Sequence, residues 1–284
     1  MKILAAVFAY NRRTMLERCI RSVFDQTLQP DQLVIVDDRS DAATSEFIEE
    51  FSSHSNVTTI QKGTNRGPAH SWRIMHKWAE LENPEYLFPI EADYVFRKNA
   101  FAEVVDTLEH TEEGAHALGI VGYDHPNAYS PYVRNAVFPR GMKLQMGADN
   151  VNRAALYRND GSHIQLASNT CPTSYLKWRA IQKLADRYPE MRRQFWEVGD
   201  PQEKAGYPES GEYMRKQYID DGMLSHVLNY WWNVAALEGD VDRERFSAWL
   251  NIRPSLAQNF DGGGVHSSGA EGTSQWGASP TWAP

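Results

Sequence analysis

The first 110 residues alternate between short strand-like runs and longer segments of helical periodicity, and this alternation restricts the fold more than any other feature. The strand-like runs are apolar or β-branched and lie at 2–9, 33–36, 57–61 and 86–90. Apolar residues recur at helical spacing over 11–28, 41–51, 67–81 and 98–110. Runs this short and this apolar are typical of strands buried on both faces. The pattern predicts an α/β fold, in which βαβ units surround a mainly parallel sheet.

The composition is that of a globular protein with a substantial core. Of 284 residues, 42% are hydrophobic and 23% charged, and no apolar run approaches the length of a membrane span. The net charge of −8 disfavours non-specific binding to nucleic acid or anionic membrane, since both are negative. Cys19 and Cys171 are too few for a disulfide framework, and Cys19 lies on an apolar helix face. We therefore expect a buried thiol, a reducing cytoplasmic location and no signal peptide.

The run at 33–36 leads directly into Asp37 and Asp38. In a doubly wound sheet the carboxyl ends of the strands border the ligand crevice, where carboxylates can accept hydrogen bonds from a base or a ribose. The alternative is a helix cap, because the sequence of this turn also allows Ser40 or Asp41 to cap the following helix. The two interpretations are compatible, since one turn offers several carboxylates.

A second strand-like run, 86–90, ends on Glu91 and Asp93. Two acids separated by one residue point to the same side of an extended chain. Such a pair can face one hard cation, Mg²⁺ or Mn²⁺, that carries phosphates. The alternative is a solvated loop in which the two acids have no joint role.

These motifs resemble the opening of the family 2 glycosyltransferases, which have the GT-A fold. The resemblance covers residues 8–41 most closely and weakens beyond residue 105. Glu91-Ala92-Asp93 occupies the place of the family's Asp-x-Asp motif, with Glu for the first Asp. The other matching stretches are Tyr10-Asn11-Arg12, Ser22, Gln26-Thr27, Val36-Asp37-Asp38-Arg39-Ser40 and Asn65-Arg66-Gly67.

The resemblance implies a nucleotide-sugar donor, most simply a UDP-sugar, bound with Mn²⁺ or Mg²⁺. Asp38 would hydrogen-bond the uracil, and Asp93 would hold the metal that bridges the diphosphate. Glu91 would hold the ribose or a metal-bound water. Arg73 either reaches the donor or is a solvated helix arginine. The remaining donor-side residues implied by the match are Phe8, Ala9, Tyr10, Asn11, Arg12, Asp37, Asn65, Gly67 and Ala92.

In the second half, amphipathic helices are predicted over 171–188 and within 217–232. Asp220 and Asp221 precede the apolar face of the latter, where acids also serve as N-terminal caps. The resemblance to the Glu-Asp motif of inverting members makes Asp221 the general base, with Asp220 in place of the Glu.

A late segment, 254–259, resembles a Pro-Ser-Leu-x-Gln-His stretch of GT-A enzymes, with Asn259 at the position of the His. His266 follows shortly afterwards in a glycine-rich loop. A late histidine commonly completes the metal shell in these enzymes. Whether Asn259 or His266 does so is left open by the sequence.

The resemblance implies a nucleotide-sugar-binding half at 1–110, an acceptor-binding half of the same GT-A domain at 111–260 and a flexible segment at 261–284. It predicts a metal-dependent inverting hexosyl- or pentosyltransferase acting on the hydroxyl of a glycan, lipid, protein or modified nucleic acid. The alternatives are a DNA-modifying glycosyltransferase acting on hydroxylated bases and a non-catalytic nucleotide-sugar-binding module. A nucleotidyltransferase is disfavoured because the turn at 8–13 contains no glycine.

Overall fold

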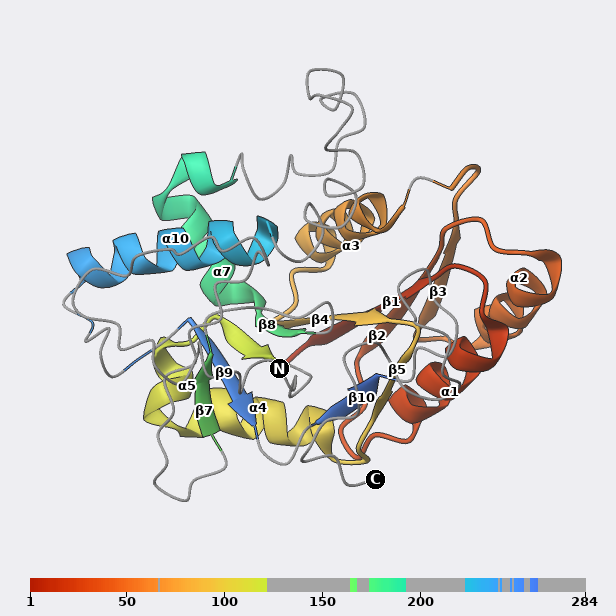
Figure 1. Cartoon of the computed structure of the whole chain (residues 1–284), viewed down its shortest axis with the longest axis horizontal. Helices are drawn as coiled ribbons and strands as arrows, with labels where there is room; N and C mark the ends of the chain where they lie inside the picture. The colour runs from red at the N-terminus through yellow and green to blue at the C-terminus, as the bar shows by residue number, and fades with distance from the viewer. Residues whose placement is uncertain are drawn as a thin grey trace, which may run out of the picture.

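The described part of the chain forms an eight-stranded sheet with helices on both faces (Figure 1). A computed structural model describes residues 1–65, 67–121, 164–167, 174–192, 223–239, 241, 246, 248–252 and 256–259. The strands of the sheet are β1 (Ile3–Ala9), β2 (Gln32–Asp37), β3 (Val57–Gln61), β4 (Tyr86–Glu91), β6 (Gly119–Val121), β7 (Ile164–Ala167), β8 (Ser174–Lys177) and β9 (Trp249–Ile252). A separate two-stranded ribbon consists of β5 (Tyr94–Phe96) and β10 (Ala257–Asn259).

The helices include one short 3-10 turn. In the described part of the chain they include α1 (Arg13–Phe24), α2 (Ala42–Glu49), η1 (Glu50–Ser53), α3 (Pro68–Glu82), α4 (Ala100–His110), α5 (Glu112–His116), α7 (Trp178–Arg187) and α10 (Met223–Glu238). Among the described residues, no helix has the length and apolar character that crossing a bilayer requires.

The strand order in the sheet is β3-β2-β1-β4-β8-β6-β9-β7. The strands β3, β2, β1 and β4 are parallel to one another, β8 is antiparallel to β4 and β6, and β7 is antiparallel to β9. The predicted βαβ units and mainly parallel sheet are therefore confirmed. Because β2 and β4 lie on opposite sides of β1, the direction of winding reverses between β1 and β4.

The central strand β1 shows why its sequence is apolar throughout. All seven of its residues are buried. Ile3, Ala5 and Val7 pack into one core with α1 and α4, whereas Leu4 and Ala6 pack into the other with α3 and α7. A strand covered on both faces needs an apolar side chain at every position, which is the pattern of the sequence.

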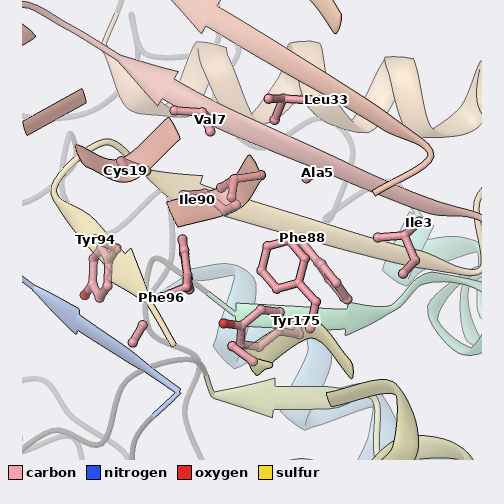
Figure 2. Close-up of a cluster of buried hydrophobic side chains, with 14 of the residues drawn as sticks. Ile3, Ala5, Val7, Cys19, Leu33, Phe88, Ile90, Tyr94, Phe96 and Tyr175 are labelled. Atoms are coloured by element: carbon pink, nitrogen blue, oxygen red, sulfur yellow. The ribbon is translucent and has the colours of Figure 1, made fainter. Parts of the chain in front are cut away.

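On the α1 face, an aromatic cluster connects the sheet to the ribbon (Figure 2). The ring of Phe88 on β4 lies 4.8 Å from Tyr175 on β8 and 5.1 Å from Phe101 on α4, both edge-on. Phe96 on β5 packs against Phe101 at 5.6 Å. This cluster anchors the segment that follows the acidic turn at 91–93.

The polar side chains at the end of α1 fix the same segment. Gln26 is buried, and its amide nitrogen donates to the carbonyl of Arg97 at 2.7 Å. Its amide oxygen accepts from the N–H of Phe101 at 3.1 Å, and Ser22 Oγ accepts from the N–H of Phe96 at 3.2 Å. These hydrogen bonds satisfy buried backbone groups between β5 and α4 and hold that connection against α1.

The prediction of a continuous helix over 171–188 is wrong in its first part. Residues 174–177 form β8, and only 178–187 form a helix, α7. Tyr175 packs into the core on the α1 face and Leu176 into the core on the α3 face, which is the two-sided alternation of a strand. Pairing of β8 with both β4 and β6 outweighs the helical spacing of the local sequence.

A buried histidine in the core on the α3 face provides a test of this packing. His76 is stacked on Trp178 at 5.7 Å, and burial lowers its pKa to about 3. An unfolded histidine titrates near pH 6.5, so acidification protonates the unfolded chain first. We expect this residue to remove about 2 kcal/mol from the free energy of unfolding at pH 5 and nothing above about pH 7.5.

Urea denaturation at pH 5 and pH 8 measures this effect. In His76→Phe the loss of stability between the two pH values should be smaller than in the wild type by about 2 kcal/mol. The exposed His110→Phe serves as the control and should largely keep the wild-type pH dependence. Equal pH dependence in His76→Phe and the wild type would contradict the assignment.

Candidate functional site

The carboxyl ends of β1, β2 and β4 meet at one edge of the sheet, where the winding reverses. In the strand register, Ala9 is the partner of Asp37, and Phe8 is the partner of Glu91. The two acidic turns therefore leave the sheet on either side of β1. In open α/β sheets this is the position at which ligands bind.

The carboxylate of Asp37 stabilises the turn after β2 by hydrogen bonds. Asp37 is buried, and its carboxylate accepts from the N–H of Ser40 at 2.9 Å and from the hydroxyl of Ser45 at 3.0 Å. Asp41 caps α2 by accepting from the N–H of Thr44 at 2.9 Å, as one of the two predicted capping residues. The capping interpretation of the turn is thus confirmed for Asp41, while Asp37 fastens the turn to α2.

Asp38 forms a buried ion pair that the sequence did not reveal. Its carboxylate lies 2.6 Å from Lys62 Nζ, and the side chains of the two residues are only 7% and 3% exposed. Lys62 Nζ also donates to the carbonyl of Gly67 at 3.2 Å and to the hydroxyl of Ser71 at 3.0 Å. The backbone N–H of Asp38 donates to the carbonyl of Ala9 at 2.8 Å. Asp38 is thereby fixed to β1, to the end of β3 and to the start of α3.

Gly67 and Asn65 shape the connection from β3 to α3. Gly67 has a φ of 78°, a backbone conformation that favours glycine, and its carbonyl accepts from Lys62. The N–H of Gly67 donates to Asn65 Oδ1 at 3.1 Å. The turn therefore presents its backbone toward the Asp38–Lys62 pair.

The turn after β1 is tied to the turn after β2. The N–H of Asn11 donates to Ser40 Oγ at 2.8 Å, and Asn11 Oδ1 accepts from the N–H of Asp41 at 2.8 Å. Asn11 and Arg12 both have positive φ, 53° and 55°, so the tie holds an unusual backbone in place. The preceding Tyr10 is half exposed at the rim.

The acidic turn after β4 lies against the start of α1. Asp93 is buried, and its carboxylate lies 3.4 Å from the guanidinium of Arg12. Glu91 is half-buried at the end of β4, and its carbonyl accepts from the thiol of Cys19. Burial, together with the charge of Asp93, raises the pKa of Cys19. The thiol thus stays protonated beneath the turn, and the predicted buried thiol is confirmed.

Glu91 and Asp93 offer the oxygen ligands that Mg²⁺ and Mn²⁺ prefer, so the donor set fits such an ion. In the part of the chain that the structure describes, no group of three or more histidine, cysteine or acidic side chains could hold a metal. The ribbon adds a further neighbour, because Asn259 on β10 is the register partner of Tyr94. Asn259, which stands at the position of the family's late histidine, is therefore paired with the residue that follows Asp93.

The other predicted residues are distributed as follows. Phe8 is buried with its ring 5.5 Å from Trp72, Ala9 ends β1, and Ala92 is half-buried in the acidic turn. Arg73 is half-buried on α3. Asp220, Asp221 and His266 lie outside the described residues, as does the segment 261–284. Hydrogen bonds and an ion pair therefore connect the turn that contains Asp38, the turn at 10–12 and Asp93. The roles of these residues in binding a donor and a metal stay predictions.

Comparison with protein families matches this chain to the glycosyl transferase family 2 model over residues 5–170, more than half of its length. The chain belongs to glycosyl transferase family 2. The sequence resemblance is thus confirmed, and so is the GT-A fold class, whose mainly parallel sheet and flanking helices are described above. No curated protein matches this family 2 chain in sequence.

Solved structures similar to this family 2 chain include complexes with a nucleotide or a nucleotide sugar. S. aureus TarS 1–349 in complex with UDP is 17% identical, with a TM-score of 0.44, over 78% of this chain and 54% of that one. The mannosyltransferase PcManGT from Pyrobaculum calidifontis, with GDP-Man and Mn²⁺, is 15% identical, with a TM-score of 0.48, over 88% and 56%. A further S. aureus TarS structure matches 65% of this chain and 30% of its own length, at 18% identity and a TM-score of 0.42.

Proposed function

We propose that this chain transfers a sugar from a nucleotide-sugar donor, a UDP-sugar in the first instance, to an acceptor hydroxyl with the help of Mn²⁺ or Mg²⁺. The observation that carries the proposal is the pair of buried carboxylates, Asp38 and Asp93, beside the switch point of the sheet. Hydrogen bonds join the turn after β1 to the turn after β2, and Arg12 in the first of these turns pairs with Asp93. These contacts hold the rim of the site in place. Family membership supplies the reaction class.

In this proposal the donor base lies against Asp38 and is flanked by Phe8, Ala9 and Tyr10. Asp93 would hold the metal, with Asn259 or His266 as a further ligand. Glu91 would either bind the metal directly or hold the ribose or a metal-bound water. When bound, the ion offsets the charge that builds on the leaving diphosphate. The further residues assigned to the donor side are Asn11, Arg12, Asp37, Asn65, Gly67, Arg73 and Ala92.

The acceptor side rests on the second half of the chain, 111–260. Asp221 would take the proton from the acceptor hydroxyl as that oxygen attacks the anomeric carbon, and Asp220 would stand beside it. Attack opposite the leaving diphosphate inverts the anomeric configuration and needs no covalent enzyme intermediate. The segment 1–110 then forms the donor half and 261–284 a flexible end, and the cytoplasmic location stays a prediction.

Release of nucleoside diphosphate from a panel of nucleotide sugars tests the proposal. The purified chain is incubated with UDP-, GDP-, CDP- and ADP-sugars in the presence of Mn²⁺, and again with EDTA. We expect release from a UDP-sugar that EDTA abolishes, because the metal offsets the charge on the leaving group. The same product mixtures, analysed by NMR, report the anomeric configuration of the transferred sugar.

Three outcomes would count against the proposal. Release that persists in EDTA would refute the metal dependence, and retention of configuration would refute direct displacement. Binding of a nucleotide sugar without any release, across a broad panel of acceptors, would favour the non-catalytic module.

A further inference from the structure

We propose that Arg12 is an exchangeable counter-ion, whose guanidinium neutralises Asp93 in the metal-free chain and is displaced when a divalent cation binds there. The metal-free site would therefore bind a metal more weakly than its carboxylates alone allow. The inference depends on the proposed function, in which Asp93 holds the metal.

The two buried carboxylates of the site have counter-ions of different kinds. Asp38 lies 2.6 Å from Lys62 Nζ, and both side chains are buried. Lys62 is fixed by further hydrogen bonds to Gly67 and Ser71. Asp93 lies 3.4 Å from the guanidinium of Arg12, and the arginine side chain is 41% exposed. Since charge-assisted hydrogen bonds usually measure about 2.7–2.9 Å, the second pair is loose, and its cation has open solvent into which it can move.

The position of Arg12 opposes the preferences of its own backbone. Arg12 is the N-cap residue of α1, where Ser, Thr, Asp and Asn are favoured, and its side chain makes no capping hydrogen bond. Its φ of 55° lies in the left-handed region, which side chains with a Cβ disfavour. The helix dipole also disfavours a cation at this end of α1. The contact with Asp93 is an observed gain that offsets these costs.

Electrostatics explain why a metal and the guanidinium compete for Asp93. A buried carboxylate that lacks a cation carries a large desolvation penalty, so the metal-free site needs a positive charge near Asp93. A divalent ion on the same carboxylate supplies that charge and repels a guanidinium close by. The N-terminus of α1 adds to the repulsion. Binding of the metal therefore breaks the Arg12–Asp93 pair, and the loss of this pair weakens the net affinity for the metal.

Titration of the full chain with Mn²⁺ alone, with the free ion measured by EPR, tests the exchange. Arg12→Gln removes the charge and retains a long polar side chain. We expect this variant to bind Mn²⁺ about 5- to 10-fold more tightly than the wild type, because no ion pair has to be broken. Arg12→Lys retains a cation and should bind Mn²⁺ with an affinity closer to that of the wild type than to that of Arg12→Gln.

The matched control is Arg21→Gln. Arg21 lies on the same helix, is exposed and pairs with Glu17. This variant should bind Mn²⁺ as the wild type does, because it loses a positive charge that does not contact Asp93.

Melting temperatures give a second readout, which a purely structural role of Arg12 would not reproduce. Without metal, Arg12→Gln leaves the buried Asp93 carboxylate without this cation and should melt below the wild type. Saturating Mn²⁺ should raise the melting temperature of Arg12→Gln by more than that of the wild type, because the variant binds the ion more tightly. A side chain that only stabilised the turn would lower the melting temperature equally with and without the ion.

A measurement on the wild type does not require that Arg12→Gln folds. In a chain labelled with ¹⁵N-arginine, the Nε–H signal of Arg12 is assigned by its absence from Arg12→Lys. We expect saturating Mg²⁺, which is diamagnetic, to move this signal toward the position of a solvated arginine. A signal that stays unchanged would contradict the displacement of Arg12.

The outcomes separate this inference from the proposed function. If Arg12→Gln folds and binds Mn²⁺ no more tightly than the wild type, the inference is wrong, while metal-dependent release of diphosphate by the wild type would still support the proposed function. If none of the chains binds Mn²⁺, with or without UDP, the metal role in the proposed function is refuted together with the inference.

Discussion

Replacing Asp93 with asparagine is expected to lower nucleoside diphosphate release from the preferred donor by roughly 1,000-fold. Asp93 is the buried member of the acidic turn, and its carboxylate is the ligand proposed to hold the metal at the diphosphate. An amide keeps the shape of the side chain and removes the charge. Steady-state kinetics at rising Mn²⁺ concentrations measure the effect, and the loss should persist at saturating metal.

The matched control for this substitution is Asp106→Asn. Asp106 lies on α4 with its side chain 78% exposed and pairs with His110, far from any proposed role. It should release diphosphate at the wild-type rate. Wild-type release by a folded Asp93→Asn chain would remove Asp93 from the mechanism, and with it the metal role of the turn.

Replacing Lys62 alone with methionine is expected to lower the free energy of unfolding by about 3–5 kcal/mol. The substitution leaves the Asp38 carboxylate buried without its 2.6 Å partner, while methionine fills a similar volume. Removing both charges together avoids that penalty. Asp38→Asn with Lys62→Met should therefore be more stable than Lys62→Met, although it carries one more substitution.

Urea denaturation of the three chains at one pH measures these differences. The exposed Lys77→Met on α3 supplies the control and should stay within about 0.5 kcal/mol of the wild type. If the double variant is no more stable than Lys62→Met, the burial of an unpaired charge is not the reason why the single substitution lowers the free energy of unfolding.

The first half of the fold could be predicted from the sequence because its strands are buried on both faces. Each apolar run up to 90 corresponds to a strand, and each periodic segment contains a helix. The prediction failed at 174–177, where apolar side chains at helical spacing form a strand. The partners of β8 are β4 and β6, and such distant pairing leaves no local signal at Tyr175 and Leu176.

Part of the candidate site could also be predicted, because its acidic residues directly follow strands that the sequence reveals. Asp38 and Asp93 follow predicted strands, so their meeting at one edge follows from the parallel order of β1, β2 and β4. Lys62 was missed, although its place directly after a predicted strand was the available signal. Asp37, predicted on the donor side, has its carboxylate bound to Ser40 and Ser45, and a side chain's hydrogen-bond partners cannot be read from strand order.

The ribbon of β5 and β10 has a consequence for biosynthesis. β5 follows the acidic turn early in the chain, but its partner β10 is among the last residues that the structure describes. A nascent chain that has left the ribosome as far as residue 121 contains all of β1–β4 and no β10. The acidic turn and β5 would thus be made long before β10, so a product that ends between them would expose the unpaired edge of β5 to proteases and to other strands.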